Sequence, residues 1–293
     1  MAYRSVSGPG GEPPPGPAPV RTGGDDPPAV PLPAELAGPA RTLFADRLPL
    51  AAAYAELLAG PGVLRGLIGP RETPRIWDRH LLNCAAVVEL LPPGVSIVDV
   101  GSGAGLPGIV LAIARPDLTV TLVEPLARRA VFLAEAVSTL DLTDRVTVVR
   151  ARAEELAARR REGGRRRSGR SAEPVAASPG EPVELADLPA GLPVPADVVT
   201  ARAVAPLDRL ARWCLPLVLP GGRMLALKGA SAAEEVAEHA SAVRRSGGSA
   251  PVVRQAGVGV VDPPTTVVEV VRDGVARPAA RGTARSRRGD TAR

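Results

Sequence analysis

A glycine-rich segment near the middle of the chain has the residue types and the spacing of a ligand-binding turn. It reads Val98-Asp99-Val100-Gly101-Ser102-Gly103-Ala104-Gly105-Leu106-Pro107-Gly108 and joins a short apolar stretch to a helical one. A turn of this kind between a strand and a helix lets the backbone approach a ligand closely. It also leaves N–H groups free at the start of the helix. The segment therefore predicts a cofactor site.

The glycine spacing fits two cofactors. Gly103, Gly105 and Gly108 match the G-x-G-x-x-G pattern of a dinucleotide site. Gly101, Gly103 and Gly105 match instead the D-x-G-x-G-x-G turn of S-adenosylmethionine (SAM) methyltransferases. The second register starts the turn directly after the apolar stretch, whereas the first register starts it two residues later and lengthens the loop. The spacing therefore favours SAM over NAD(P).

Acidic residues support the same choice. Asp99 lies two residues before the first glycine, where methyltransferases often carry an acid and dinucleotide-binding strands are usually apolar. Glu124 follows the next apolar stretch, where an acid binds ribose hydroxyls in either register. An NAD(P)-dependent oxidoreductase would also need a substrate domain with an acid–base residue, for which the chain has little room. That oxidoreductase stays an alternative.

Alternating apolar stretches and helical periods must position this turn. Six stretches predict strands: 96–100, 119–123, 146–150, 197–200, 223–227 and 266–271. Four segments between them predict helices: 106–114, 126–140, 207–217 and 232–245. The alternation predicts an α/β fold, a doubly wound and mostly parallel sheet with helices on both faces. Right-handed crossovers then place the functional crevice at the carboxyl ends of the first strands.

Composition divides the chain further. We expect a disordered Pro/Gly-rich arm at 1–33, N-terminal helices at 34–94 and the α/β domain at 95–273. We also expect a disordered basic insertion at 157–195 and a basic disordered tail at 274–293, because these segments have few bulky apolar side chains.

Charge and cysteine content narrow the function classes. The net charge is +5, and the runs 159–170 and 277–293 carry seven and six arginines against one acid each. Such basic segments suggest a polyanionic partner, nucleic acid before membrane, although solvated linkers would have the same composition. Two cysteines provide neither a zinc cluster nor a disulfide framework, so we expect no metal. No apolar run has the length of a membrane span, and we expect a cytoplasmic protein.

Further short motifs accompany the glycine turn in a fixed order. They are Arg79-His80-Leu81-Leu82-Asn83, Glu124 with Arg128-Arg129, Arg152-Ala153-Glu154-Glu155, Thr200-Ala201-Arg202-Ala203 and Ala226-Leu227-Lys228-Gly229. From about Arg75 to Gly229, the chain resembles the bacterial ribosomal RNA small-subunit methyltransferase G family, also called glucose-inhibited division protein B.

The resemblance implies a class I SAM-methyltransferase (Rossmann-like) fold and a SAM-dependent enzyme. Its implied product is 16S ribosomal RNA methylated at N7 of one guanine, made on the RNA or on the small-subunit particle. The glycine turn, Glu124 and the resemblance together indicate the cofactor contacts. The expected contacts are Gly101, Gly103, Gly105, Leu106, Glu124, Ala153, Glu154 and Arg202. The expected RNA contacts are His80, Arg128, Arg129, Arg152 and Lys228.

The implied chemistry needs few catalytic groups. Guanine N7 has an exposed lone pair and no proton at neutral pH, so we expect no general base; positioning and electrostatics supply the rate. Carbon-5 methylation of cytosine would need a nucleophilic cysteine, but Cys84 and Cys214 lie in apolar helical stretches and are expected to pack. A SAM-dependent methyltransferase of a small molecule and a non-catalytic RNA-binding module stay as further alternatives.

Overall fold

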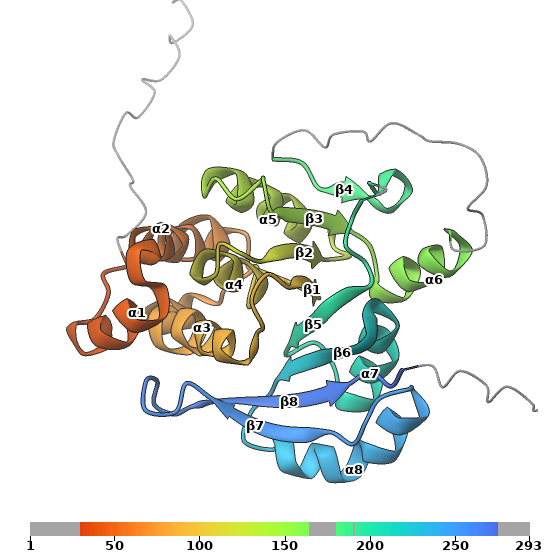
Figure 1. Cartoon of the computed structure of the whole chain (residues 1–293). Helices are drawn as coiled ribbons and strands as arrows, with labels where there is room; N and C mark the ends of the chain where they lie inside the picture. The colour runs from red at the N-terminus through yellow and green to blue at the C-terminus, as the bar shows by residue number, and fades with distance from the viewer. Residues whose placement is uncertain (1–29, 164–179, 190, 275–293) are drawn as a thin grey trace, which may run out of the picture.

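A central sheet organises the part of the chain that the computed structural model describes, which is residues 30–163, 180–189 and 191–274 (Figure 1). Its strands are β1 Ser96–Val100, β2 Thr119–Val123, β3 Val146–Arg150, β4 Val183–Glu184, β5 Ala196–Arg202, β6 Val218–Leu227, β7 Val252–Ala256 and β8 Thr265–Val271. They pair in the order β4-β3-β2-β1-β5-β6-β8-β7. β1 to β6 run parallel, whereas β8 is antiparallel to both β6 and β7. The mostly parallel sheet and all six predicted strands are thus confirmed.

Helices cover both faces of the sheet. The first group is α1 Ala37–Phe44, α2 Leu48–Leu57, α3 Asn83–Ala85, α4 Gly108–Ala114 and α5 Ala127–Thr139, and the second is α6 Ala153–Gly163, α7 Leu207–Cys214 and α8 Ala232–Arg245. Short 3₁₀ or π segments extend them: η1 Ala34–Leu36, η2 Ala45–Arg47, η3 Leu58–Gly62, η4 Pro70–Arg75, η5 Ile76–Leu82, η6 Ala86–Leu90, η7 Leu185–Asp187 and η8 Leu215–Leu217. No helix in the described ranges is both long and apolar enough to cross a membrane.

The core is divided by the sheet into two layers. Successive strand side chains point to opposite faces, so that Ile97 packs with α1 to α5 whereas Val98 packs with α6 to α8. The central strands are apolar on both sides because both faces are covered, as is usual for parallel sheets. This arrangement leaves the carboxyl ends of the strands as the place where polar residues can gather.

The N-terminal helices are part of the same core as the sheet. The Tyr54 hydroxyl of α2 donates a hydrogen bond of 2.6 Å to the Ala104 carbonyl in the glycine turn. Asn83 of α3 donates to the Thr265 hydroxyl of β8 over 2.9 Å, and the Thr265 hydroxyl donates back to the Asn83 carbonyl over 2.8 Å. The helices therefore support the turn and the sheet directly.

The prediction of a disordered insertion over 157–195 is wrong at both of its ends. At the first end, α6 continues to Gly163, and Ala157 is buried. At the second end, β4 pairs with β3, and Arg150 forms an ion pair of 2.9 Å with Glu184. Apolar side chains hold these segments as well, since Val183 and Val194 are buried and Leu185, Leu188 and Leu192 pack against the core. The predicted disordered arm over 1–33 is also wrong at its end, because Val30 and Leu32 pack against the core and the Val30 carbonyl accepts a hydrogen bond of 3.1 Å from the Trp77 indole. Residues 1–29, 164–179, 190 and 275–293, which hold the rest of the predicted arm, insertion and tail, lie outside the described residues.

Candidate active site

The carboxyl ends of β1, β2, β3 and β5 meet at a cavity of about 720 Å³. Ten of the residues predicted for the site line it: His80, Gly101, Gly103, Leu106, Glu124, Arg129, Arg152, Ala153, Glu154 and Arg202. Three predicted residues, Gly105, Arg128 and Lys228, are not among the lining residues. The fold thus brings most of the predicted residues together, although they come from segments far apart in the chain.

The backbone identifies which glycines make the turn. Gly101, Gly103 and Gly105 have φ angles of +69°, +59° and +99°, in the left-handed region that favours glycine. Gly108 already belongs to α4, and a Cβ there would clash with the side chains of Leu122 and Asp99. The turn therefore uses the register of the methyltransferase pattern, and the glycine of the other register serves close helix packing.

Glu124 connects the turn to the end of β2. Its carboxylate is buried, with Oε2 accepting a hydrogen bond of 3.0 Å from the Gly103 N–H and Oε1 accepting one of 3.0 Å from the Leu126 N–H. Each carboxylate oxygen has a second lone pair. Glu124 is thus fixed in orientation and keeps acceptor capacity in the wall of the cavity.

Asp99 has a different environment from the one its place in the motif suggests. It is fully buried and lies outside the cavity wall. The Thr200 hydroxyl donates to its Oδ1 over 2.7 Å, and the Gly108 N–H donates to its Oδ2 over 3.2 Å. Burial raises the pKa of Asp99 to about 6, although these hydrogen bonds favour the charged form. Asp99 therefore joins β5 to the start of α4 and does not face a ligand.

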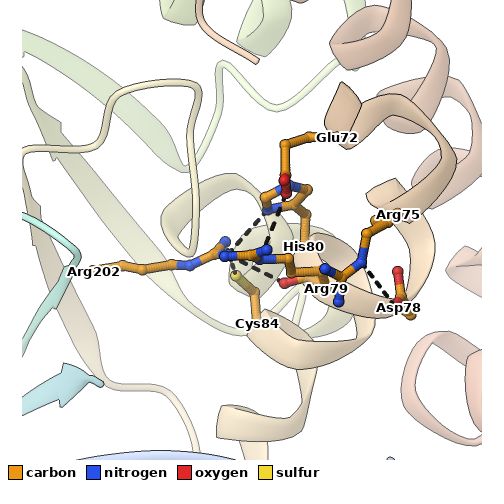
Figure 2. A network of polar contacts seen from close by, with 7 residues as sticks. All are labelled: Glu72, Arg75, Asp78, Arg79, His80, Cys84 and Arg202. Atoms are coloured by element: carbon orange, nitrogen blue, oxygen red, sulfur yellow. Dashed lines mark hydrogen bonds and ion pairs between the residues drawn. The ribbon is translucent and has the colours of Figure 1, made fainter. Parts of the chain in front are cut away.

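Arg202, at the end of β5, lines the cavity, and its side chain points toward η5 and α3 (Figure 2). Its Nη1 lies 3.3 Å from the Cys84 sulfur, and its Nη2 donates to the Arg79 carbonyl over 3.1 Å and lies 3.0 Å from the His80 Nδ1. The other ring nitrogen of His80, Nε2, lies 3.2 Å from Glu72 Oε2. The guanidinium is therefore held by the N-terminal helical layer.

His80 is electrically neutral in this network. Burial, and then the positive charge of Arg202, lower the pKa of His80 to about 4, although Glu72 acts in the opposite direction. A neutral imidazole has one N–H and one acceptor nitrogen. Since a guanidinium can only donate, Nδ1 is the acceptor, and Nε2 carries the hydrogen that is donated to Glu72.

The predicted RNA contacts fall into two groups. Arg128 and Arg152 are exposed, and Arg129 is half-buried in the cavity wall. Lys228 is largely buried; its Nζ forms an ion pair of 2.8 Å with Glu235 and donates to the Ala205 carbonyl over 2.9 Å. His80 has both ring nitrogens engaged and is only 8% exposed. The three arginines are therefore accessible to a polyanion, whereas Lys228 and His80 already have protein partners.

Sequence reasoning missed several lining residues. They are Leu67, Ile68, Glu72, Arg79, Leu126, Val204 and Trp213. Trp213 is half-buried in the cavity wall. Arg79 directly precedes His80 in a motif quoted above, so this motif was the available signal. Leu126 and Val204 are exposed apolar side chains, at 53% and 36%, which carry no motif.

The strand order, the antiparallel β8 between β6 and β7, and the glycine turn after β1 define the fold of class I SAM-dependent methyltransferases. The family model for rRNA small subunit methyltransferase G (GidB) matches residues 47–164 and 191–258, and the chain belongs to this family.

Curated relatives of the chain carry the name Ribosomal RNA small subunit methyltransferase G. The protein from Salinispora tropica is 62% identical over 257 residues, which cover 88% of this chain and 95% of that protein. The protein from Corynebacterium efficiens is 47% identical over 242 residues, which cover 83% of this chain and 90% of that protein. The resemblance found in the sequence motifs is thus confirmed over most of the chain.

Proposed function

We propose that the protein transfers the methyl group of SAM to N7 of a guanine in 16S ribosomal RNA. The observation that carries this proposal is the left-handed turn at Gly101, Gly103 and Gly105, with Glu124 fixed to it; Gly101, Gly103 and Glu124 line the cavity. Membership of the rRNA small subunit methyltransferase G family supports the RNA substrate.

The residues present fit SAM. Glu124 keeps acceptor capacity for ribose hydroxyls. Gly101 and Gly103 have no side chains, so their backbone lies directly at the cavity wall. The Arg202 guanidinium suits the carboxylate of the methionine part, because Arg pairs with carboxylates through charge-assisted hydrogen bonds. Leu106, Ala153 and Glu154 complete the proposed contacts. When bound, SAM supplies an electrophilic methyl group on a sulfonium.

The protonation states around the cavity favour a nucleophile that needs no base. His80 is neutral and has both ring nitrogens engaged, so it has no free position from which to take a proton. Burial raises the pKa of the Cys84 thiol and also that of Cys214, which disfavours the thiolate that a covalent cytosine mechanism needs. Guanine N7 meets these conditions, since its lone pair is available without deprotonation.

Arg128, Arg129 and Arg152 are the RNA contacts that we propose, with phosphate groups as their partners. Arg129 and Arg152 line the cavity, and Arg128 is exposed beside Arg129 in the first turn of α5. Arginine suits phosphate recognition. The substrate is 16S rRNA, free or within a small-subunit particle. Lys228 and His80 are not among the proposed contacts, because Lys228 forms an ion pair with Glu235 and His80 contacts Arg202.

A paired glycine substitution tests the cofactor site. A Cβ on Gly103 would lie 3.8 Å from the Gly101 carbonyl oxygen, its only neighbour within 4 Å, so Gly103→Ala should place a methyl group at the cavity rather than in the protein. Gly221→Ala is the control, since Gly221 also has a positive φ, +82°, and open space but does not line the cavity. Calorimetry should show SAM binding to the unchanged protein and the control, and at least about tenfold weaker binding to Gly103→Ala. Tight binding of NAD without binding of SAM would overturn the proposal.

A further inference from the structure

The position of the Arg202 guanidinium depends on groups from another layer of the fold. Cys84, the Arg79 carbonyl and His80 Nδ1 all lie within 3.3 Å of its two Nη atoms, on α3 and η5 (Figure 2). A free arginine side chain has many rotamers, and ordering it on ligand binding would weaken the binding. The contacts to Cys84, Arg79 and His80 hold the Arg202 side chain in one orientation, which reduces this cost.

Glu72 determines which ring nitrogen of His80 can accept a hydrogen bond. Its Oε2 lies 3.2 Å from His80 Nε2 and 3.5 Å from Arg79 Nε. A carboxylate can only accept, so it keeps the hydrogen of the neutral ring on Nε2 and leaves Nδ1 as an acceptor for Arg202. Without Glu72, the ring could place its hydrogen on Nδ1, toward a guanidinium that can only donate.

We propose that His80 is a positioning residue for the cofactor: with its hydrogen directed to Glu72, it presents Nδ1 to Arg202 and holds the guanidinium where it meets the carboxylate of SAM. This inference rests on the proposed function, since it assigns that carboxylate to Arg202. It also explains why η4 and η5, which precede the whole sheet in the chain, contribute Glu72 and His80 to the cavity wall.

The binding of two ligands, compared in the same variant, distinguishes a positioning role of His80 from a role in packing alone. SAM has a carboxylate, whereas 5′-methylthioadenosine keeps the adenosine and the sulfur but has no carboxylate. Calorimetric titration of both into His80→Gln should show SAM binding weakened about tenfold and 5′-methylthioadenosine binding unchanged, because one charge-assisted interaction is lost. His80→Asn should bind SAM within about threefold of the unchanged protein, since the Asn Oδ1 can replace Nδ1 as the acceptor.

Substitutions at Glu72 provide a second measurement, since this residue is only partly buried and its loss should not prevent folding. Glu72→Gln still offers an acceptor to Nε2 and should bind SAM normally, whereas Glu72→Ala should bind it several-fold more weakly. Equal weakening of both ligands, or no weakening of SAM in His80→Gln and Glu72→Ala, would overturn the inference. If the unchanged protein binds no SAM, the proposed function itself fails, so the two failures can be distinguished.

Discussion

At the scale of single residues, the buried Asp99 makes the stability of the protein depend on pH. Its carboxyl group is fully buried, and burial raises its pKa to about 6, above the value near 3.9 of an exposed aspartate. Between these two values the folded protein binds the proton and the unfolded chain does not. Stability from this group is therefore present at low pH and is lost as the pH rises from about 4 to about 6.

The substitution Asp99→Asn tests this dependence, because asparagine cannot ionise. We expect the unfolding free energy of the variant, relative to the unchanged protein, to rise by about 2 kcal/mol between pH 4.5 and pH 7.5. Urea unfolding at both pH values measures the difference, and other titrating groups cancel in the comparison. A difference that stays constant with pH would contradict the assignment.

The glycine register could be predicted at this scale, whereas the role of Asp99 could not. The register depends on local spacing, which the sequence contains directly. The burial of Asp99 depends on Thr200, which is 101 residues away, and on the helix start at Gly108. The contact between Arg202 and His80 could not be predicted either, because it joins residues 122 positions apart in the sequence.

At the scale of elements, α2 supports the glycine turn. The Tyr54 hydroxyl donates to the Ala104 carbonyl, and a Cβ on Gly105 would approach that hydroxyl to 2.8 Å, so helix and turn are closely packed. Tyr54→Phe removes the donor and keeps the ring. We expect a loss of about 1–3 kcal/mol of unfolding free energy, because a buried carbonyl is left without its partner. SAM binding should weaken as well.

Thr42→Val is the matched control for that substitution. It removes an exposed hydrogen bond of 3.2 Å from the Thr42 hydroxyl to the Gly38 carbonyl within α1. Urea unfolding and calorimetry should show little change in this variant. A similar loss of stability in both variants, or none in Tyr54→Phe, would contradict a supporting role for α2.

Central elements could be predicted, and edge elements could not. The strands from β1 to β3 are apolar on both faces, which is a strong pattern in sequence. β7 was missed because it lies at the sheet edge and four of its five residues are exposed, so no apolar pattern marks it. β4 was missed because its two residues are too few to form a pattern; it pairs with β3 at the edge of the sheet.

At the scale of the whole molecule, charge outside the described residues should strengthen RNA binding. Residues 164–170 carry four arginines, and residues 275–293 carry six arginines and one aspartate. Deleting both segments leaves α6 complete, because this helix ends at Gly163. We expect weaker binding of 16S rRNA and a smaller salt dependence, by about one unit of slope for each lost phosphate contact. SAM binding should be unchanged, and an unchanged salt slope would contradict a role in RNA binding.

The position of the transferred methyl group tests the central claim most directly. The protein is incubated with labelled SAM and either 16S rRNA or small-subunit particles, and the RNA is then treated with borohydride and aniline. N7-methylation leaves a cationic guanine with a labile glycosidic bond, which this treatment cleaves. We predict label in 16S rRNA and chain cleavage at one guanine, both dependent on SAM and both reduced with Gly103→Ala. Label that stays in RNA resistant to cleavage would contradict N7 as the acceptor.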